Sequence, residues 1–325
     1  MNGAHVCSLA LVLAFAPIAS PGAASANSEN LGAEKFSVRC TPTDTGLEEL
    51  SGLLWTENSG YAVGDHGSDD RIALLDSQCQ VSQWIDIGVE TIDVEDLAQD
   101  DTGVLWLADT GDNNMNRELV TLIGLNPETG QTTTVPLRLP DAPHDIEAFA
   151  LTPSGTPVLV TKTKDGSAQI FTTPHATVHT LSRDEPTTLA SAGAVSVPGD
   201  DARPITGAAV SADGTSAALR TKKEVYIYRI EDRDVAAAFS SPPASTITVP
   251  EQPQGEAVAF THSGDLLVAS EADGGALPSI HQLDAEMLPA RPAESDRSFE
   301  TIVAIFILVL IVAGVFVYRT FKARN

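Results

Sequence analysis

Basic residues are scarce in this chain of 325 residues, which has 19 Lys and Arg against 44 Asp and Glu and a formal net charge of −25. Nucleic-acid binding needs clustered Lys and Arg to displace counterions from phosphates, so this scarcity excludes a nucleic-acid partner. Charged residues of both signs are only 19% of the chain, whereas 42% is hydrophobic. A chain this apolar can bury a core, so we expect a folded acidic protein rather than a disordered acidic tail.

Residues 1–26 contain no Asp, Glu, Lys or Arg. An apolar stretch from Leu9 to Ala16 is followed by Ala24-Ser25-Ala26, which fits the A-x-A cleavage site of a secretory signal peptide. The missing Lys and Arg before the apolar stretch are unusual for such a peptide, and a misassigned start codon would explain them. We predict that residues 1–26 are removed and that the rest of the chain is exported.

Cysteine is also rare, with three residues in the chain. Cys7 lies in the segment that we expect to be removed, which leaves Cys40 and Cys79 in the mature protein. Because the predicted location is oxidising, we expect these two residues to form a disulfide. Two buried free thiols are the alternative.

A second uncharged run lies near the C-terminus, at residues 302–318, and is apolar on every side. A buried helix of a soluble protein would show a polar face, so we predict a transmembrane helix over residues 301–318. The flank after it is basic and the flank before it is acidic, which places the C-terminus in the cytoplasm and the bulk of the chain outside. Residues 289–300 are then a short stalk, and residues 319–325 a basic cytoplasmic tail.

No helical pattern appears before residue 300, which excludes a parallel α/β fold. Instead, five segments share one order: a polar residue, a short apolar strand, a turn that ends in glycine, and a second apolar strand. The polar residues that open these segments are Glu49, Glu95, Glu147, Thr206 and Glu256. A period of about 50 residues with room for four strands is typical of a β-propeller blade.

The sequence therefore predicts an all-β fold, a β-propeller over residues 27–288. Five repeat units are visible, and the long interval at residues 176–203 leaves room for a sixth blade. The last unit is short of a final strand. We expect the segment from Phe36 to Arg39 to fill that place and to close the ring, which would remove exposed sheet edges.

The first strand of each blade lines the central channel of a propeller, so the polar residues that open these strands are predicted to meet at one mouth. Residues that end the second strands or open the third strands are predicted to join them. The predicted ligand-binding set is Glu49, Glu95, Glu147, Glu256, Lys162, Arg220, Arg71 and Arg117. A structural role is the alternative, in which Glu and Arg of adjacent blades pair and lock the ring.

Two acidic loops at the same end of the predicted ring are candidates for calcium, because Ca²⁺ prefers oxygen ligands. The predicted metal ligands are Asp65, Asp69, Asp109, Asp112 and Asn113. Neither loop follows the spacing of an EF-hand. Turns rich in Asp and Asn are also common without metal.

Several motifs in combination resemble secreted bacterial β-propellers related to the esterase-like phytase propellers. They are Val94–Ala98, Leu107–Asn113 with Arg117, Asp145–Ala148, Gly207–Gly214 with Leu219-Arg220, and Gln254–Val258. The resemblance runs from about residue 47 to residue 284 and implies the propeller fold but little chemistry. A phytase proper is similar in fold and looks like a calcium propeller that holds phosphates with clustered Lys and Arg. The predicted mouth of this chain is acidic instead, so we do not predict phytase activity.

The sequence has no G-x-S-x-G nucleophile motif and no H-E-x-x-H zinc motif, so no catalytic residue is assigned. We expect a membrane-anchored extracytoplasmic propeller that binds a surface protein, a glycan or a small molecule. The alternative is a calcium-dependent phosphoesterase or esterase-like hydrolase with its site at the mouth.

Overall fold

The computed structural model of the chain describes residues 30–57, 59–65, 69–152, 154–163, 167–197 and 204–289. The predicted signal peptide, transmembrane helix and cytoplasmic tail lie outside these ranges, as does the predicted stalk apart from residue 289. Within the ranges, no helix combines the length and the apolar character needed to cross a membrane.

Five separate sheets form the body of the described part of the chain, and each is one blade. The four main strands of each blade pair antiparallel, and a short parallel strand is added at the edge of two blades. Blade 1 contains β3 (Leu50–Trp55), β4 (Gly60–Gly64), β5 (Arg71–Leu75) and β6 (Val81–Asp86). Blade 2 contains β7 (Val94–Gln99), β8 (Leu105–Asp109), β9 (Leu119–Leu125), β10 (Thr132–Arg138) and the short β14 (Thr187–Thr188). Blade 3 contains β11 (Ile146–Leu151), β12 (Pro157–Thr161), β13 (Ser167–Thr172) and β15 (Ala190–Ser196).

The last two blades include strands from the N-terminal part of the chain. Blade 4 contains β16 (Ile205–Val210), β17 (Ser216–Thr221), β18 (Glu224–Arg229), β19 (Ser245–Thr248) and the short β1 (Asn30–Leu31). Blade 5 contains β20 (Gln254–Phe260), β21 (Leu266–Glu271), β22 (Ile280–Leu283) and β2 (Ser37–Cys40). The helical turns are η1 (Ala33–Lys35), η2 (Thr45–Leu47), α1 (Val235–Phe239) and η3 (Ala285–Met287).

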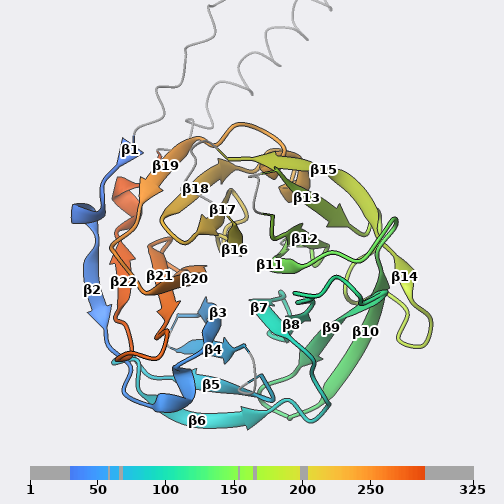
Figure 1. Ribbon diagram of the computed structural model, residues 1–325, viewed down its shortest axis with the longest axis horizontal. Helices are drawn as coiled ribbons and strands as arrows, with labels where there is room; N and C mark the ends of the chain where they lie inside the picture. Colours follow the sequence, from blue (N-terminus) through green and yellow to red (C-terminus); the bar gives the residue numbers. More distant parts are fainter. Residues whose placement is uncertain are drawn as a thin grey trace, which may run out of the picture.

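The blades stand in a ring, with β3, β7, β11, β16 and β20 innermost (Figure 1). The prediction of a β-propeller is therefore confirmed. The long interval at residues 176–203 holds β14 at the edge of blade 2 and β15 as the outer strand of blade 3, so in the described part of the chain it forms no sixth blade. The propeller has five blades.

Tight turns between the first and second strands explain the glycines of the repeat. Gly103, Gly155, Gly214 and Gly264 have φ of +87°, +83°, +67° and +93°, a region that favours glycine. Each glycine N–H donates to the carbonyl oxygen three residues earlier, at 2.8 to 3.1 Å. In blades 2 to 5 these turns fix where the second strand begins.

Closure of the ring uses the N-terminal strand, as the sequence predicted. The outer strand β2 pairs antiparallel with β22, with Ser37 opposite Gln282 and Cys40 opposite Ile280. Cys40 forms a disulfide with Cys79, which lies in the turn between β5 and β6 of blade 1. The disulfide therefore links blade 5 to blade 1 across the closing joint.

Five apolar layers, each between two neighbouring blades, form the core. One layer, for example, packs Trp106 and Leu122 of blade 2 against Phe149 and Phe171 of blade 3. The other layers join blades 1 and 2, blades 3 and 4, blades 4 and 5, and blades 5 and 1. Because the apolar side chains are buried between blades, the inner ends of the strands near the axis are free to carry polar residues.

Candidate functional site

A β-bulge interrupts the pairing of the first and second strands in every blade, close to where the first strand begins. Bulges re-aim side chains and are common beside functional sites. The residues in the bulges are Ser51, Glu95, Glu147, Thr206 and, in blade 5, Glu256 with Ala257. We call this end of the ring, where first strands begin and second strands end, the mouth.

The bulges correct one position of the predicted set, because Ser51, not Glu49, is the first-blade counterpart of the bulged glutamates. The Glu49 carbonyl accepts the N–H of Asp65 at 2.8 Å, and the carbonyls of Asp93 and Asp145 accept in the same way in blades 2 and 3. Glu49 therefore lies at the mouth two residues before the bulge. The extra residue in the bulge shifts the register, which the letters of the sequence do not reveal.

Two groups of carboxylates meet at Glu95, on the sides facing blades 1 and 3. Glu95 and Glu147 are each 3% exposed. One oxygen each of Asp65, Asp93 and Glu95 lie within 4.8 Å of one another, as do those of Glu95, Asp145 and Glu147. Blades 1, 2 and 3 thus bring together residues that are far apart in the sequence.

Asp93 and Asp145 were missing from the predicted site. A signal for them exists, since Asp93-Val94-Glu95 and Asp145-Ile146-Glu147 repeat one D-x-E pattern at equivalent places in blades 2 and 3. The structure shows why the spacing matters. One carboxylate oxygen of each glutamate lies within 4.8 Å of an oxygen of the aspartate two residues earlier.

Lys162 is the cation inside this part of the mouth. It follows β12 and forms a hydrogen-bonded ion pair with Glu147 Oε1. Burial raises the pKa of Glu147 to about 7, although Lys162 acts in the opposite direction. Burial, and then the charges of Glu147, Asp65 and Asp93, raise the pKa of Glu95 well above its usual value. One lysine does not neutralise this group of acids.

Blade 5 adds two further acids to the mouth. Glu256 is 5% exposed and Glu271 is 6% exposed. Burial, and then the charges of Glu147 and Glu271, raise the pKa of Glu256 well above its usual value. Lys222 opposes this rise and donates to the Gln254 side chain at 3.2 Å. The Gln254 amide in turn donates to Glu271 at 2.5 Å, so this side of the mouth is a connected polar network.

Arg71 and Arg117, which the sequence placed at the mouth, have other partners. The Arg71 guanidinium carbon lies 4.1 Å from the ring centre of Trp84 on the outer strand β6. Arg117 donates to the Gly111 carbonyl at 2.7 Å and to Asp109 Oδ1 at 3.0 Å. Both side chains stabilise the blades they belong to.

Internal contacts engage the acids of the second predicted calcium loop. Asp109 Oδ1 accepts from Arg117 and, at 3.0 Å, from the N–H of Asp93. Asp112 accepts from the Arg117 N–H at 2.7 Å, and Asn113 is exposed. Asp69 is buried at 8% exposure but belongs to neither carboxylate group around Glu95. Among the predicted ligands, Asp65 is the one that belongs to a carboxylate group in the described part of the chain.

Arg220 is completely buried rather than presented at the mouth. It extends from β17 of blade 4 into blade 5, where it donates to the carbonyls of Ala257 at 2.5 Å and Ala269 at 2.6 Å and to Gln252 Oε1 at 2.5 Å. Burial lowers the pKa of Arg220 to about 9, against the effect of Glu256. A side chain at Gly255 would collide with the guanidinium, so this glycine makes room for it.

Asp96, next to Glu95, ties three inner strands together. Its Oδ2 accepts the N–H of Phe149 on β11 and of Ala208 on β16, both at 3.0 Å, and its Oδ1 accepts that of Leu97 at 2.9 Å. Burial raises the pKa of this carboxyl to about 8, although all three N–H donors favour its charged form. The sequence pattern does not predict this link between the three strands.

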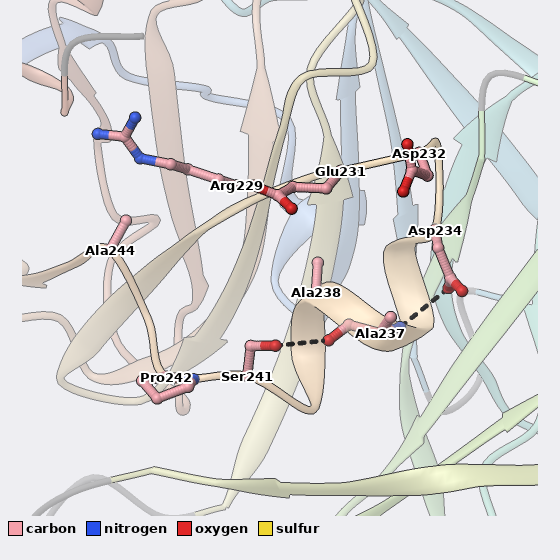
Figure 2. A pocket seen from close by; sticks show the side chains of 9 residues that line it. All are labelled: Arg229, Glu231, Asp232, Asp234, Ala237, Ala238, Ser241, Pro242 and Ala244. Atoms are coloured by element: carbon pink, nitrogen blue, oxygen red, sulfur yellow. Dashed lines mark hydrogen bonds between the residues drawn. The ribbon is translucent and has the colours of Figure 1, made fainter. Parts of the chain in front are cut away.

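A hollow of about 510 Å³ lies away from the mouth, where α1 connects β18 to β19 (Figure 2). Figure 2 shows a lining of alanines and acids, with the Asp234 carboxylate accepting from the Ala237 N–H at 2.9 Å and Ser241 donating to the Ala237 carbonyl at 2.9 Å. These polar groups stabilise the ends of α1. The mouth is therefore the better candidate for a binding site.

Comparisons with known proteins agree with the fold. Residues 163–298 match the family described as "Lipoprotein LpqB beta-propeller domain". Glutaminyl cyclase from Myxococcus xanthus has a solved structure that is similar at 12% identity and a TM-score of 0.50, over 79% of this chain and 98% of that chain. No curated protein matches. These findings do not confirm the relation to the esterase-like phytase propellers, and they support a bacterial β-propeller.

Proposed function

We propose that this protein is an extracytoplasmic binding module whose acidic mouth captures a basic partner, a protein or peptide that presents lysine or arginine side chains. The observation that carries the proposal is the meeting of carboxylates from blades 1, 2, 3 and 5 at one mouth. The carboxylates are Glu49, Asp65, Asp93, Glu95, Asp145, Glu147, Glu256 and Glu271. Lys162 and Lys222 offset them only in part.

Electrostatics at such a mouth favours a cationic ligand for two reasons. Desolvation makes the charged form of these acids costly, so a positive group that enters gains more than it would at an exposed surface. The surrounding strands belong to a closed ring, so the acids are held in place before the partner arrives. A rigid, preorganised site of this kind is what a binding module needs.

The proposed location is the cell envelope. It is supported by the match to a lipoprotein propeller family and by the predicted signal peptide. In the proposed arrangement residues 301–318 tether the propeller to the membrane with its mouth outside. Oxidation of Cys40 and Cys79 to a disulfide fits an extracytoplasmic compartment.

Binding of a fluorescent lysine-rich peptide tests the proposed function, with a glutamate-rich peptide of the same length as reference. We expect the full-length chain in detergent to bind only the lysine-rich peptide, with an affinity that falls as salt rises. The double replacement Glu256→Gln and Glu271→Gln is expected to weaken binding about tenfold, because it removes two groups that can carry negative charge opposite the peptide and keeps the side-chain volumes. Fluorescence anisotropy in the presence of a chelator measures both effects.

The matched control removes the same charge far from the mouth, with Glu128→Gln and Glu185→Gln, both exposed. Its affinity is expected to stay within about twofold of the unmodified protein, because exposed charges contribute little. Equal binding of the lysine-rich peptide by the mouth variant and the control would show that the mouth is not the binding surface.

A calcium-dependent hydrolase is a second proposal, favoured by the paired carboxylates of Glu95 and Glu147 within one buried group. We expect such an enzyme to turn over a phosphoester, ester or lactone and to lose that activity with chelator. Screening the full-length chain against these three substrate classes, with Glu147→Gln as the matched variant, measures it. Turnover that is the same in the variant, or absent for every class, would reject the hydrolase.

A further inference from the structure

Glu95 has a feature that the capture of a basic partner does not explain. Its side chain is 3% exposed, and within the described residues its Oε1 is buried with no hydrogen-bond partner. Buried polar atoms are nearly always satisfied, and a buried carboxylate oxygen without a partner is costly. The unpaired Glu95 Oε1 therefore indicates that a ligand binds at this position.

The neighbours of this oxygen are carboxylates. Asp65 follows β4, Asp93 precedes β7, and Glu95 lies in the bulge of β7, so the three come from the facing edges of blades 1 and 2. One oxygen of each lies within 4.8 Å of the other two. Ligand oxygens on opposite sides of one calcium ion are about 5 Å apart, so the spacing fits a single ion.

Gly111 lies directly against the same atoms. A Cβ at this position would collide with Glu95 Oε1 and with Asp93 Oδ2. The N–H of Gly111 donates to the Asp93 carbonyl at 3.1 Å, which fixes the loop against the group. The glycine therefore allows both carboxylates to pack against the loop, and any larger residue would push them apart.

The neighbouring group of Glu95, Asp145 and Glu147 is a weaker candidate for an ion. Glu147 is paired with Lys162, and Asp145 Oδ1 accepts the Asp112 N–H at 2.8 Å. The lysine already supplies the positive charge on that side. Two of the three carboxylates in that group are therefore already engaged by a lysine and by a backbone N–H.

We propose that Asp65, Asp93 and Glu95 bind one hard divalent cation, with calcium as the best fit, at the junction of blades 1 and 2. All three ligands are carboxylates, which suit calcium better than zinc, and calcium tolerates the irregular arrangement better than magnesium. Of these ligands, the sequence placed only Asp65 in a calcium site. The ion lies beyond the proposed capture of a basic partner, because that capture is measured in chelator and does not depend on it. The ion does not rest on the hydrolase proposal either, because metal binding is measured without turnover.

Calorimetric titration of CaCl₂ into the full-length chain in detergent, freed of metal by a chelator, tests the site. We expect one saturable site per chain and an affinity that falls as the pH is lowered, because protons compete for the carboxylates. Glu95→Gln is expected to weaken calcium binding by at least about tenfold, since it removes a ligand charge and retains the size of the side chain. Gly111→Ala is expected to weaken it without any change of charge.

The control is Glu256→Gln, a change at another buried glutamate of the mouth that is outside the group, and its calcium affinity is expected to stay within about threefold. No saturable calcium binding by the unmodified chain would overturn the proposal, as would an unchanged affinity in Glu95→Gln. Binding of Mg²⁺ as tight as that of Ca²⁺ would overturn the choice of calcium. A chain that binds the lysine-rich peptide but no metal would reject this inference alone.

Discussion

Replacement of Arg220 by alanine is expected to lower the free energy of unfolding by about 4 kcal/mol. The guanidinium is completely buried and donates to two carbonyls of blade 5 and to the amide oxygen of Gln252 in the loop before it. Its loss leaves those acceptors unsatisfied, opens a cavity and removes the charge that offsets Glu256. Urea denaturation of the full-length chain, followed by tryptophan fluorescence, measures the change.

Two variants separate this structural role from the ligand-binding role that the sequence predicted. Arg220→Lys keeps a positive charge but loses the planar fork, so we expect a loss of about 2 kcal/mol. Arg229→Ala, at the exposed end of β18 in the same blade, is expected to change stability by less than about 0.5 kcal/mol. If Arg220→Ala unfolded at the same urea concentration as the unmodified chain but bound the lysine-rich peptide differently, Arg220 would be a ligand contact after all.

Arg220 also shows where prediction from the sequence failed. Its place at the end of a second strand was correct, but the direction of its side chain depends on Gly255, which leaves room for the guanidinium in the next blade. Arg71 was misplaced for a similar reason, because it stacks on Trp84 of a strand that only the folded blade brings beside it. Contacts of this kind depend on side-chain packing, which the repeat pattern does not contain.

The fold was predictable because each blade repeats the same local signals. Turn glycines such as Gly103 and Gly155 need positive φ, and their spacing marks the hairpins without any knowledge of the tertiary structure. The site was predictable in part. Glu95, Glu147 and Glu256 lie at the mouth as expected. In blade 1, however, the bulge position that these glutamates hold in the other blades belongs to Ser51, and Glu49 lies two residues before it.

Reduction of the disulfide between Cys40 and Cys79 is expected to lower the free energy of unfolding by about 4 kcal/mol, from the entropy of the loop it closes. The two cysteines are 39 residues apart in the sequence. For a propeller of this size the loss corresponds to a fall of about 10 °C in the thermal midpoint. Differential scanning calorimetry of the full-length chain, with and without reductant, measures it.

The position of the disulfide makes a local prediction as well, because β2 is held in blade 5 by its pairing with β22 while Cys79 belongs to blade 1. Without the covalent link the closing strand is the part of the ring that opens most easily, so hydrogen exchange should accelerate first at the paired residues Val38 and His281. In Cys40→Ala the thermal midpoint should equal that of the reduced chain and should not respond to reductant. Equal midpoints for the oxidised and reduced chains, with unchanged exchange in β2, would show that strand pairing alone closes the ring.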